Sequence, residues 1–193
     1  MFEKLHSFFK RRFPITEEQA AFAETLFIPK KVKKGEFVIR EGDAARYAMF
    51  VASGCLRTYI IDNKGKEHIL QFSPEDWWTG DMNSFLTGMP SRSYIDAIED
   101  TELLLFDKVA FQKLNEYIPA SAPDFQNAMQ KSIVASNERI LSSLSSTAEE
   151  RYNEFLKKYP SLPQRVPQHM IASYLGISPE TLSRIRKQRT HNQ

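Results

Sequence analysis

The chain has 193 residues, a net charge of +2, and 41% hydrophobic against 26% charged residues. This composition suits one large or two smaller globular domains and excludes disordered, collagen-like and repeat proteins. The longest apolar run, Tyr47 to Ala52, is far shorter than the roughly 20 residues of a membrane helix. The basic residues at the N-terminus follow the apolar ones, so we expect no secretory signal, no membrane partner and a cytoplasmic location.

Residues that could bind a metal or perform catalysis are few and scattered. The single cysteine, Cys55, can form neither an internal disulfide nor a cysteine-based zinc site. His68 is the one histidine between residues 28 and 107, and His6, His169 and His191 lie on other segments. We therefore expect no metal site and no enzymatic activity, although a small β-roll would also fit a metal-binding cupin.

The first 27 residues predict two short helices. Apolar residues recur at helical spacing on one side of the first, at Phe2, Leu5, Phe9 and Phe13. Pro14 interrupts this helix, and Thr16 is the expected N-cap of the second, TEEQAAFAETLF. We expect these helices to cover a sheet rather than to lie on a membrane surface.

Between residues 28 and 106, turn residues occur about every ten positions. This spacing predicts many short antiparallel strands in a barrel, sandwich or jelly roll. The expected strands are EFVIREGD, YAMFVASG, CLRTYIID, KEHILQF, SYIDAIED and TELLLFD. The tetrapeptide Asp62-Asn63-Lys64-Gly65 predicts a hairpin. Trp77 and Trp78, in the irregular middle, indicate core packing more than stacking on a ligand.

The period then changes to that of helices, first in VAFQKLNEYIP and then in the long segment APDFQNAMQKSIVASNERILSSLSS. Apolar and small residues on the long helix step by three or four, which defines a narrow seam formed by Phe125, Met129, Ile133, Ser136, Ile140 and Leu144. Such a seam is either ordinary core packing or a dimer contact. Its place between two domains favours a dimer.

A linker is predicted at residues 145–147, before the last part of the chain. Thr147 and Glu150 form a capping box that starts the helix AEERYNEFLKKY. From residue 149 onward there are eight Lys and Arg against four Asp and Glu, whereas the preceding residues carry 18 against 20. This asymmetry indicates an anionic partner for the tail, or else only a solvated helix surface.

The segment QHMIASYLGISPETLSRIRKQ has the features of a helix-turn-helix. Ala172 allows a close helix crossing, and Gly176 supplies the left-handed residue that ends the first helix. Ser178 is the expected N-cap of the second helix, with Pro179 at its first position. The alternative is a plain helical hairpin retained for packing alone.

The outward residues of this motif are suited to DNA. Arginine can bond to a guanine edge in the major groove, and a basic helix end can contact phosphates. The predicted DNA-binding residues are Gln168, Ser178, Pro179, Glu180, Thr181, Arg184 and Lys187.

With these motifs, above all residues 171–187 and 35–43, the chain resembles the Crp/Fnr superfamily of transcription regulators. The resemblance implies an α+β fold with N-terminal helices, an antiparallel double-stranded β-helix (jelly roll), a long dimerisation helix and an all-α helix-turn-helix domain. The corresponding domains are residues 1–120, 121–146 and 147–193. Family members usually add a β-hairpin wing, but only six residues follow Lys187, so we expect a wingless variant with fewer phosphate contacts.

The resemblance also implies a pocket for a cyclic nucleotide, with cyclic AMP or cyclic GMP as effector. The family uses a Gly-Glu pair, a short helix and an arginine to hold ribose and phosphate. The corresponding residues here are Gly80, Asp81, Met82, Arg92 and Ser93. Asp81 is one methylene shorter than glutamate, and direct alignment puts Ser91 rather than Arg92 at the phosphate position. The pocket is therefore either functional, vestigial, remodelled for another small effector, or empty.

The predicted function is that of a homodimeric, sequence-specific DNA-binding transcription regulator whose β-roll senses a small effector. Its partners would be double-stranded DNA, a second copy of the chain and RNA polymerase. The alternative is a cyclic-nucleotide-like module with a degenerate pocket that acts on DNA without nucleotide, or only through protein partners. The two alternatives differ in whether a cyclic nucleotide binds.

Overall fold

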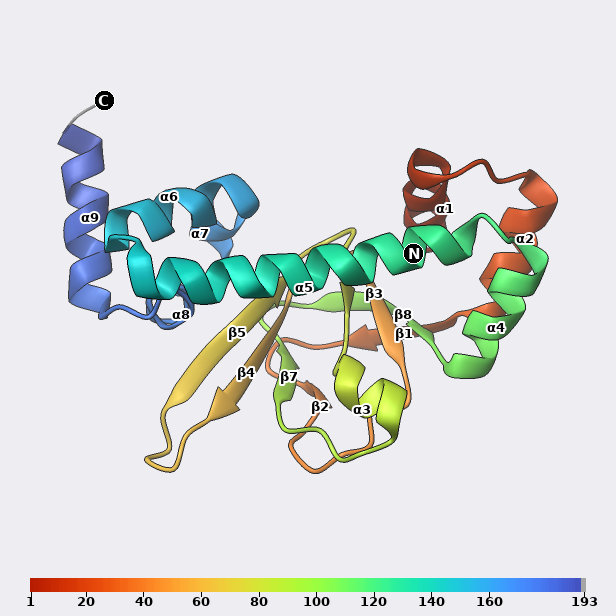
Figure 1. Ribbon diagram of the computed structural model, residues 1–193, viewed down its shortest axis with the longest axis horizontal. Coiled ribbons are helices and arrows are strands. Elements are labelled where there is room, and N and C mark those ends of the chain that lie inside the picture. Colours follow the sequence, from red (N-terminus) through yellow and green to blue (C-terminus); the bar gives the residue numbers. More distant parts are fainter. Residues whose placement is uncertain (192–193) are drawn as a thin grey trace. The chain divides into compact units, whose positions relative to one another are not determined.

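The structure is a computed structural model that describes residues 1–191 (Figure 1). It contains two compact units, one made of residues 1–61 and 70–128 and the other of residues 62–69 and 129–193. The predicted domain borders at residues 120 and 146 correspond to the two ends of one helix, α5 (Ser121–Ser145), instead of to the borders of these units. The division into three domains stays a prediction.

Two helices, α1 (Phe2–Arg12) and α2 (Glu17–Leu26), begin the chain as predicted. The Thr16 hydroxyl accepts a hydrogen bond from the Gln19 backbone N–H, and the Gln19 side chain accepts one from the Thr16 N–H. This capping box confirms the expected start of the second helix.

The strands form two four-stranded antiparallel sheets, in the orders β1-β8-β3-β6 and β2-β7-β4-β5. Their bounds are β1 Ile28–Val32, β2 Phe37–Ile39, β3 Ala48–Ser53, β4 Leu56–Ile61, β5 Glu67–Ser73, β6 Trp78–Thr79, β7 Tyr94–Ala97 and β8 Thr101–Phe106. The α+β fold with a jelly-roll-like sandwich is confirmed. The strand expected at residues 36–43 is shorter than predicted, because residues after Ile39 turn back at Gly42.

Strand β3 is buried on both faces because its side chains alternate between two cores. Met49 and Val51 lie in the core between the sheets. Phe50 and Ala52 lie in a second core, where α1, α2 and α4 (Lys108–Tyr117) cover the sheet. Trp78 belongs to this second core, where its ring lies near the rings of Phe8, Phe27, Phe50 and Phe106. The packing interpretation of this tryptophan is therefore confirmed.

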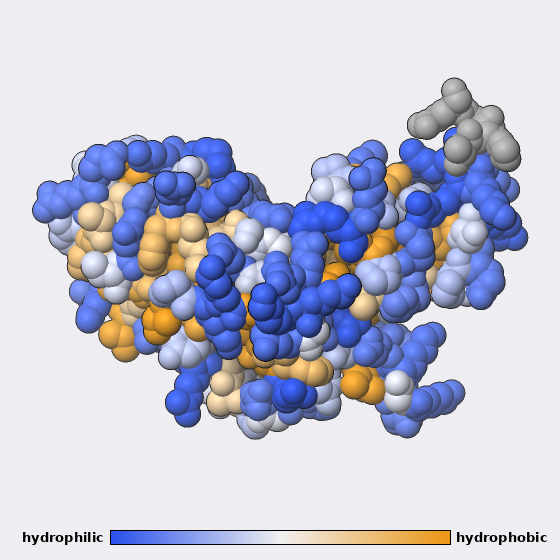
Figure 2. Space-filling model, turned by 180° about the vertical axis from the view of Figure 1, so that it is seen from behind, coloured by the Kyte–Doolittle hydropathy of each residue, from blue (hydrophilic) through white to orange (hydrophobic). Residues whose placement is uncertain are grey.

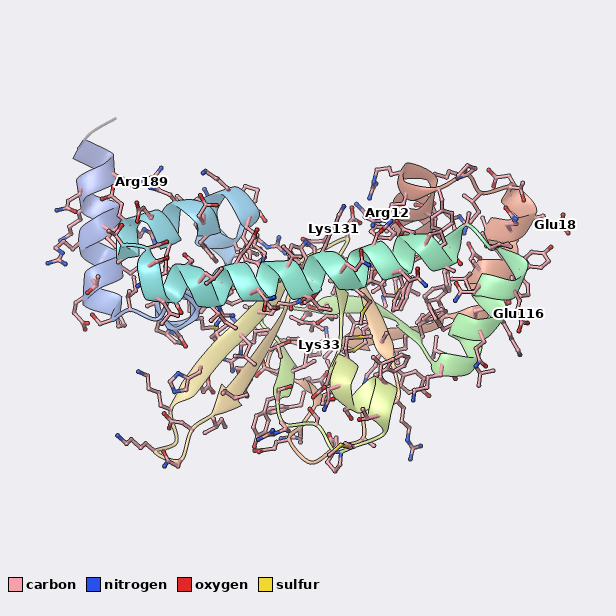
Figure 3. All side chains as sticks on the ribbon, viewed as in Figure 1. Arg12, Glu18, Lys33, Glu116, Lys131 and Arg189 are labelled. Carbon is pink, nitrogen blue, oxygen red and sulfur yellow. The ribbon has the colours of Figure 1, made fainter. Side chains whose placement is uncertain are left out.

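Polar contacts between the covering helices hold the second core closed. The Arg12 Nε atom donates to both carboxylate oxygens of Asp124, at 2.8 Å each. The Tyr117 hydroxyl donates to Glu18 at 3.1 Å, and Figure 3 shows Glu18 and Glu116 on neighbouring helices. These pairs tie α1 to the first turn of α5 and α2 to α4.

The predicted hairpin joins β4 to β5. The Asp62 N–H donates to the Lys66 carbonyl at 3.0 Å, and Gly65 has a φ of +79°. A hydrogen bond from His68, followed by those from the backbone N–H groups of Lys66 and Lys64, lowers the pKa of Asp62 to about 2. His68 is thus hydrogen-bonded to the Asp62 carboxylate in this turn.

Gly54 gives a first testable prediction, for the tight turn between β3 and β4. A Cβ atom on Gly54 would lie 2.5 Å from the Thr101 Oγ1 atom and 2.6 Å from the Asp100 carbonyl oxygen, and the φ of Gly54 is +88°. Gly54→Ala should therefore lower the free energy of unfolding by about 1–2 kcal/mol for the backbone conformation and by about 1–3 kcal/mol more for the overlap.

Urea denaturation followed by circular dichroism measures this difference. Gly65→Ala is the matched control, because it has a similar φ but nothing within 4 Å of its added Cβ. Equal losses in the two variants would contradict the role assigned to the close contact.

The remaining helices are α3 (Met82–Thr87), α6 (Ala148–Lys158), α7 (Leu162–Arg165), α8 (Gln168–Leu175) and α9 (Pro179–His191). The helices α3 and α7 are too short for their apolar residues to show a helical period in the sequence. None of the helices within residues 1–191 is long and apolar enough to cross a membrane. Hydrophilic residues predominate on the face shown in Figure 2, with hydrophobic residues in smaller areas between them.

Candidate functional site

Helices α8 and α9 form the predicted helix-turn-helix. Gly176, with a φ of +67°, ends α8, and the Ile177 N–H donates to the Ala172 carbonyl at 3.0 Å. The Ser178 hydroxyl accepts a hydrogen bond from the Thr181 N–H at 3.2 Å, and Pro179 is the first residue of α9. The left-handed cap, the serine cap and the proline are thus confirmed at the predicted positions.

The two faces of α9 differ in character. Leu182 and Ile185 are buried, together with Ile171, Ala172 and Leu175 of α8. The predicted DNA-binding residues are exposed or, for Thr181, half-buried: Gln168, Ser178, Pro179, Glu180, Thr181, Arg184 and Lys187. The structure therefore places all seven outside the buried contact between α8 and α9.

Not every basic residue of the tail belongs to this face. Arg189 is half-buried, and its guanidinium donates to the side-chain oxygen of Asn153 on α6; its place on α9 is labelled in Figure 3. The Glu180 carboxylate accepts a hydrogen bond from the Ser178 hydroxyl, which lowers its pKa. The exposed face thus presents Arg184 and Lys187 beside one carboxylate.

A second candidate site surrounds α3, where the pocket for a nucleotide was expected. Asp81 is the N-cap of this helix, and its Oδ1 atom accepts from the Ser84 N–H at 2.9 Å. Its Oδ2 atom accepts from the Ser91 hydroxyl at 2.7 Å. Burial raises the pKa of Asp81, but the hydrogen bonds from Ser84, Ser91 and the Arg92 and Asn83 N–H groups outweigh this effect and lower it.

Several polar groups around α3 are directed at the Asp81 carboxylate. The backbone N–H groups of Asn83 and Ser84, in the first turn of α3, donate to the Asp81 carboxylate. Ser91 is only 2% exposed and points at Asp81, whereas Arg92 is exposed. Of the predicted pocket residues, Asp81 and Ser93 lie together, since the Ser93 hydroxyl is 3.5 Å from the Asp81 Oδ2 atom. The side chain of Arg92 does not join them.

The long helix α5 presents a row of exposed apolar side chains. The exposed fractions are 56% for Ile133, 60% for Ile140 and 81% for Leu144, all three in the predicted seam. Val134 and Leu141, at 53% and 64%, extend the row and were not predicted. In contrast, Phe125 and Met129 are half-buried and Ser136 is exposed, and the Phe125 ring lies 4.5 Å from that of Phe111.

Among the described residues no group of His, Cys, Asp and Glu could hold a metal ion.

Comparisons with known proteins agree with this architecture. Residues 29–117 match the family model of the cyclic nucleotide-binding domain. The transcriptional activator protein Anr of Pseudomonas aeruginosa is 26% identical over 183 residues, which cover 88% of this chain and 73% of that protein.

Two solved structures have a similar fold. FixK2 of Bradyrhizobium japonicum superposes with a TM-score of 0.75 at 21% identity, covering 86% of this chain and 85% of that one. The catabolite activator protein of Thermus thermophilus superposes with a TM-score of 0.58 at 23% identity, covering 92% and 85%.

The β-roll thus has the fold and sequence pattern of a cyclic nucleotide-binding domain. The chain as a whole is similar to transcription regulators of the Crp/Fnr superfamily, as the sequence motifs predicted.

Proposed function

We propose that the protein is a homodimer that binds DNA at specific two-fold sites through α9. The observation that carries this proposal is the capped α8-turn-α9 motif, in which Leu182 and Ile185 are buried while Arg184 and Lys187 are exposed on another side of the helix. A helix of this kind enters the major groove and contacts base edges with its N-terminal residues.

The exposed side chains divide into two chemical roles. Arg184 can donate two parallel hydrogen bonds to the O6 and N7 atoms of a guanine, which carries sequence information. Lys187, one turn further along α9, is suited to a phosphate, as are the hydroxyls of Ser178 and Thr181. Gln168 is at the start of α8. It is suited to a contact with the DNA backbone, because the first helix of such a motif crosses that backbone.

Dimerisation through α5 is the second part of the proposal. Five apolar side chains of α5 are each more than half exposed on a single chain: Ile133, Val134, Ile140, Leu141 and Leu144. A second copy of the chain packed against them would remove them from water. Two linked recognition helices then bind two half-sites, which raises affinity without new contacts. This function places the protein in the cytoplasm, with its DNA, and makes RNA polymerase its natural protein partner.

Contacts around α3 favour action without a cyclic nucleotide, because the Asp81 carboxylate already takes the hydrogen bonds that a phosphate would need. A thermal melt tests this prediction. Ligand at about 100 times its dissociation constant would add about 2.7 kcal/mol of stability. We expect no rise in melting temperature with cyclic AMP or cyclic GMP, for the natural chain or for Arg92→Ala. A rise with either nucleotide would contradict the prediction, and its loss in Arg92→Ala would assign the phosphate to Arg92.

Selection from a random duplex library tests DNA binding directly. We expect the full-length protein to enrich a palindromic sequence, and fluorescence anisotropy to give an affinity for it at least about 1,000-fold above that for a scrambled duplex. Binding that does not distinguish the two duplexes and that moderate salt abolishes equally would support a motif kept for packing alone.

A further inference from the structure

The corner between α5 and α6 is held by hydrogen bonds, although the sequence predicts a linker there. Helix α5 ends at Ser145 and α6 begins at Ala148. The Thr147 hydroxyl accepts from the Glu150 N–H at 3.2 Å, while the Glu150 carboxylate accepts from the Thr147 N–H at 2.8 Å. This capping box fixes the residue at which α6 begins.

Arg151, in the next position, extends this corner to the recognition motif. Its Nη1 atom donates to the Ser146 carbonyl at 2.6 Å, directly after the end of α5. Its Nε atom donates to the Leu175 carbonyl at 3.0 Å, at the end of α8. One half-buried guanidinium thus joins the C-terminal ends of two helices that are 29 residues apart in the chain.

Both helix ends need such a partner. The last carbonyl groups of a helix have no partner within the helix and carry a partial negative charge, which a cation stabilises. Neither α5 nor α8 has a basic residue in its own last turn. The planar guanidinium, with its donors at fixed angles, satisfies both ends at once, which a single ammonium does less well.

The residues joined by Arg151 belong to parts with different roles in the proposed function. Ser146 follows the helix that carries the exposed apolar row, and Leu175 precedes the turn into α9. Because α9 is packed on α8 through buried side chains, fixing the end of α8 also fixes the direction of α9.

We infer that Arg151 is a positioning residue that sets the spacing of the two recognition helices in the dimer, and thereby the spacing of the DNA half-sites. This inference rests on the proposed function. Half-sites must lie about one helical turn apart, 10–10.5 bp, so a small change in the direction of α9 relative to α5 is expected to alter which spacing is preferred.

The test uses the full-length protein and the palindromic duplex obtained by selection, together with duplexes that have one base pair more or less between the half-sites. A duplex with a single half-site reports on α9 alone. Fluorescence anisotropy is measured for the natural chain, Arg151→Ala and Arg151→Lys. Lys157→Ala is the matched control, since it removes one positive charge from the same helix at a side chain that is 74% exposed and pairs only with Glu154 among the ion pairs described.

For Arg151→Ala we expect single half-site affinity within about threefold of the natural chain, at least about tenfold weaker binding of the optimal duplex, and affinities for the three spacings that differ by less than about threefold. Arg151→Lys should recover part of the spacing preference, because an ammonium group can still donate to one carbonyl. Lys157→Ala should keep the natural profile.

Two results would overturn the inference. One is an unchanged spacing profile in Arg151→Ala, and the other is equal loss of half-site binding in Arg151→Ala and Arg151→Lys, which would mean that Arg151 maintains the fold only. If instead the natural chain binds no selected duplex, the proposed function fails, and the half-site control separates this result from the other two.

Discussion

Replacing Arg184 by alanine should weaken binding of the selected DNA site by about 1–3 kcal/mol per half-site and relax the preference at one base pair. The reason is the position of this side chain, which is exposed in the second turn of α9, while the adjacent face of the helix is buried through Leu182 and Ile185. A guanidinium in that position can bond to a guanine edge, and alanine can make no such bond. Competition binding with single base-pair variants of the site measures the effect.

Lys187→Ala provides the contrast. An ammonium that contacts a phosphate contributes equally to every sequence, so its loss should weaken all duplexes alike and reduce the salt dependence of binding. Lys113→Ala, which removes an exposed charge on α4, should change neither property. Uniform weakening by both Arg184→Ala and Lys187→Ala would show that Arg184 contacts phosphate and that the specificity lies elsewhere.

The helix ends and turns of this chain could be predicted because they depend on local chemistry. Thr16, Thr147, Gly176 and Ser178 each act through atoms at most five residues away, so short sequence patterns were sufficient. The hairpin at Asp62 is of the same kind. These local signals placed the helix-turn-helix and its exposed face correctly.

Contacts between distant segments could not be predicted in this way. Arg57 and Asp96 form a buried pair, with the Arg57 Nε atom 2.7 Å from the Asp96 Oδ1 atom and Nη2 2.9 Å from Oδ2, because β4 and β7 are in register at these residues. A pattern within one stretch of sequence does not show which residues of two distant strands lie opposite each other.

The environment of Asp81 depends on a loop ten residues away. A glycine and an acid before a short helix are consistent with a phosphate pocket, but the orientation of Ser91 and Arg92 decides which side chain faces the carboxylate. Ser91 is buried and its neighbour Arg92 is exposed, so a shift of one position in the alignment exchanges a buried serine for an exposed arginine.

The largest expected effect is that of a charge in the apolar row of α5. Ile140→Asp should convert the dimer into monomers of 22.3 kDa and weaken binding of the two-half-site duplex by about 100-fold to 10,000-fold, while binding of a single half-site is retained. The physical reason is that a carboxylate removed from water without a partner is costly in a helix-helix contact. Ile140 is 60% exposed on the single chain, so the fold of each chain should be unaffected.

Light scattering coupled to size-exclusion chromatography measures the mass, and anisotropy measures the affinity. Ser132→Asp is the matched control: it adds the same charge to the same helix at an exposed position about 80° around the axis from Ile140 at 100° per residue, on the side opposite to Val134 and Leu141. We expect this control to remain a dimer. A dimer that persists in Ile140→Asp would assign dimerisation to another surface and leave the exposed row on α5 without the proposed role.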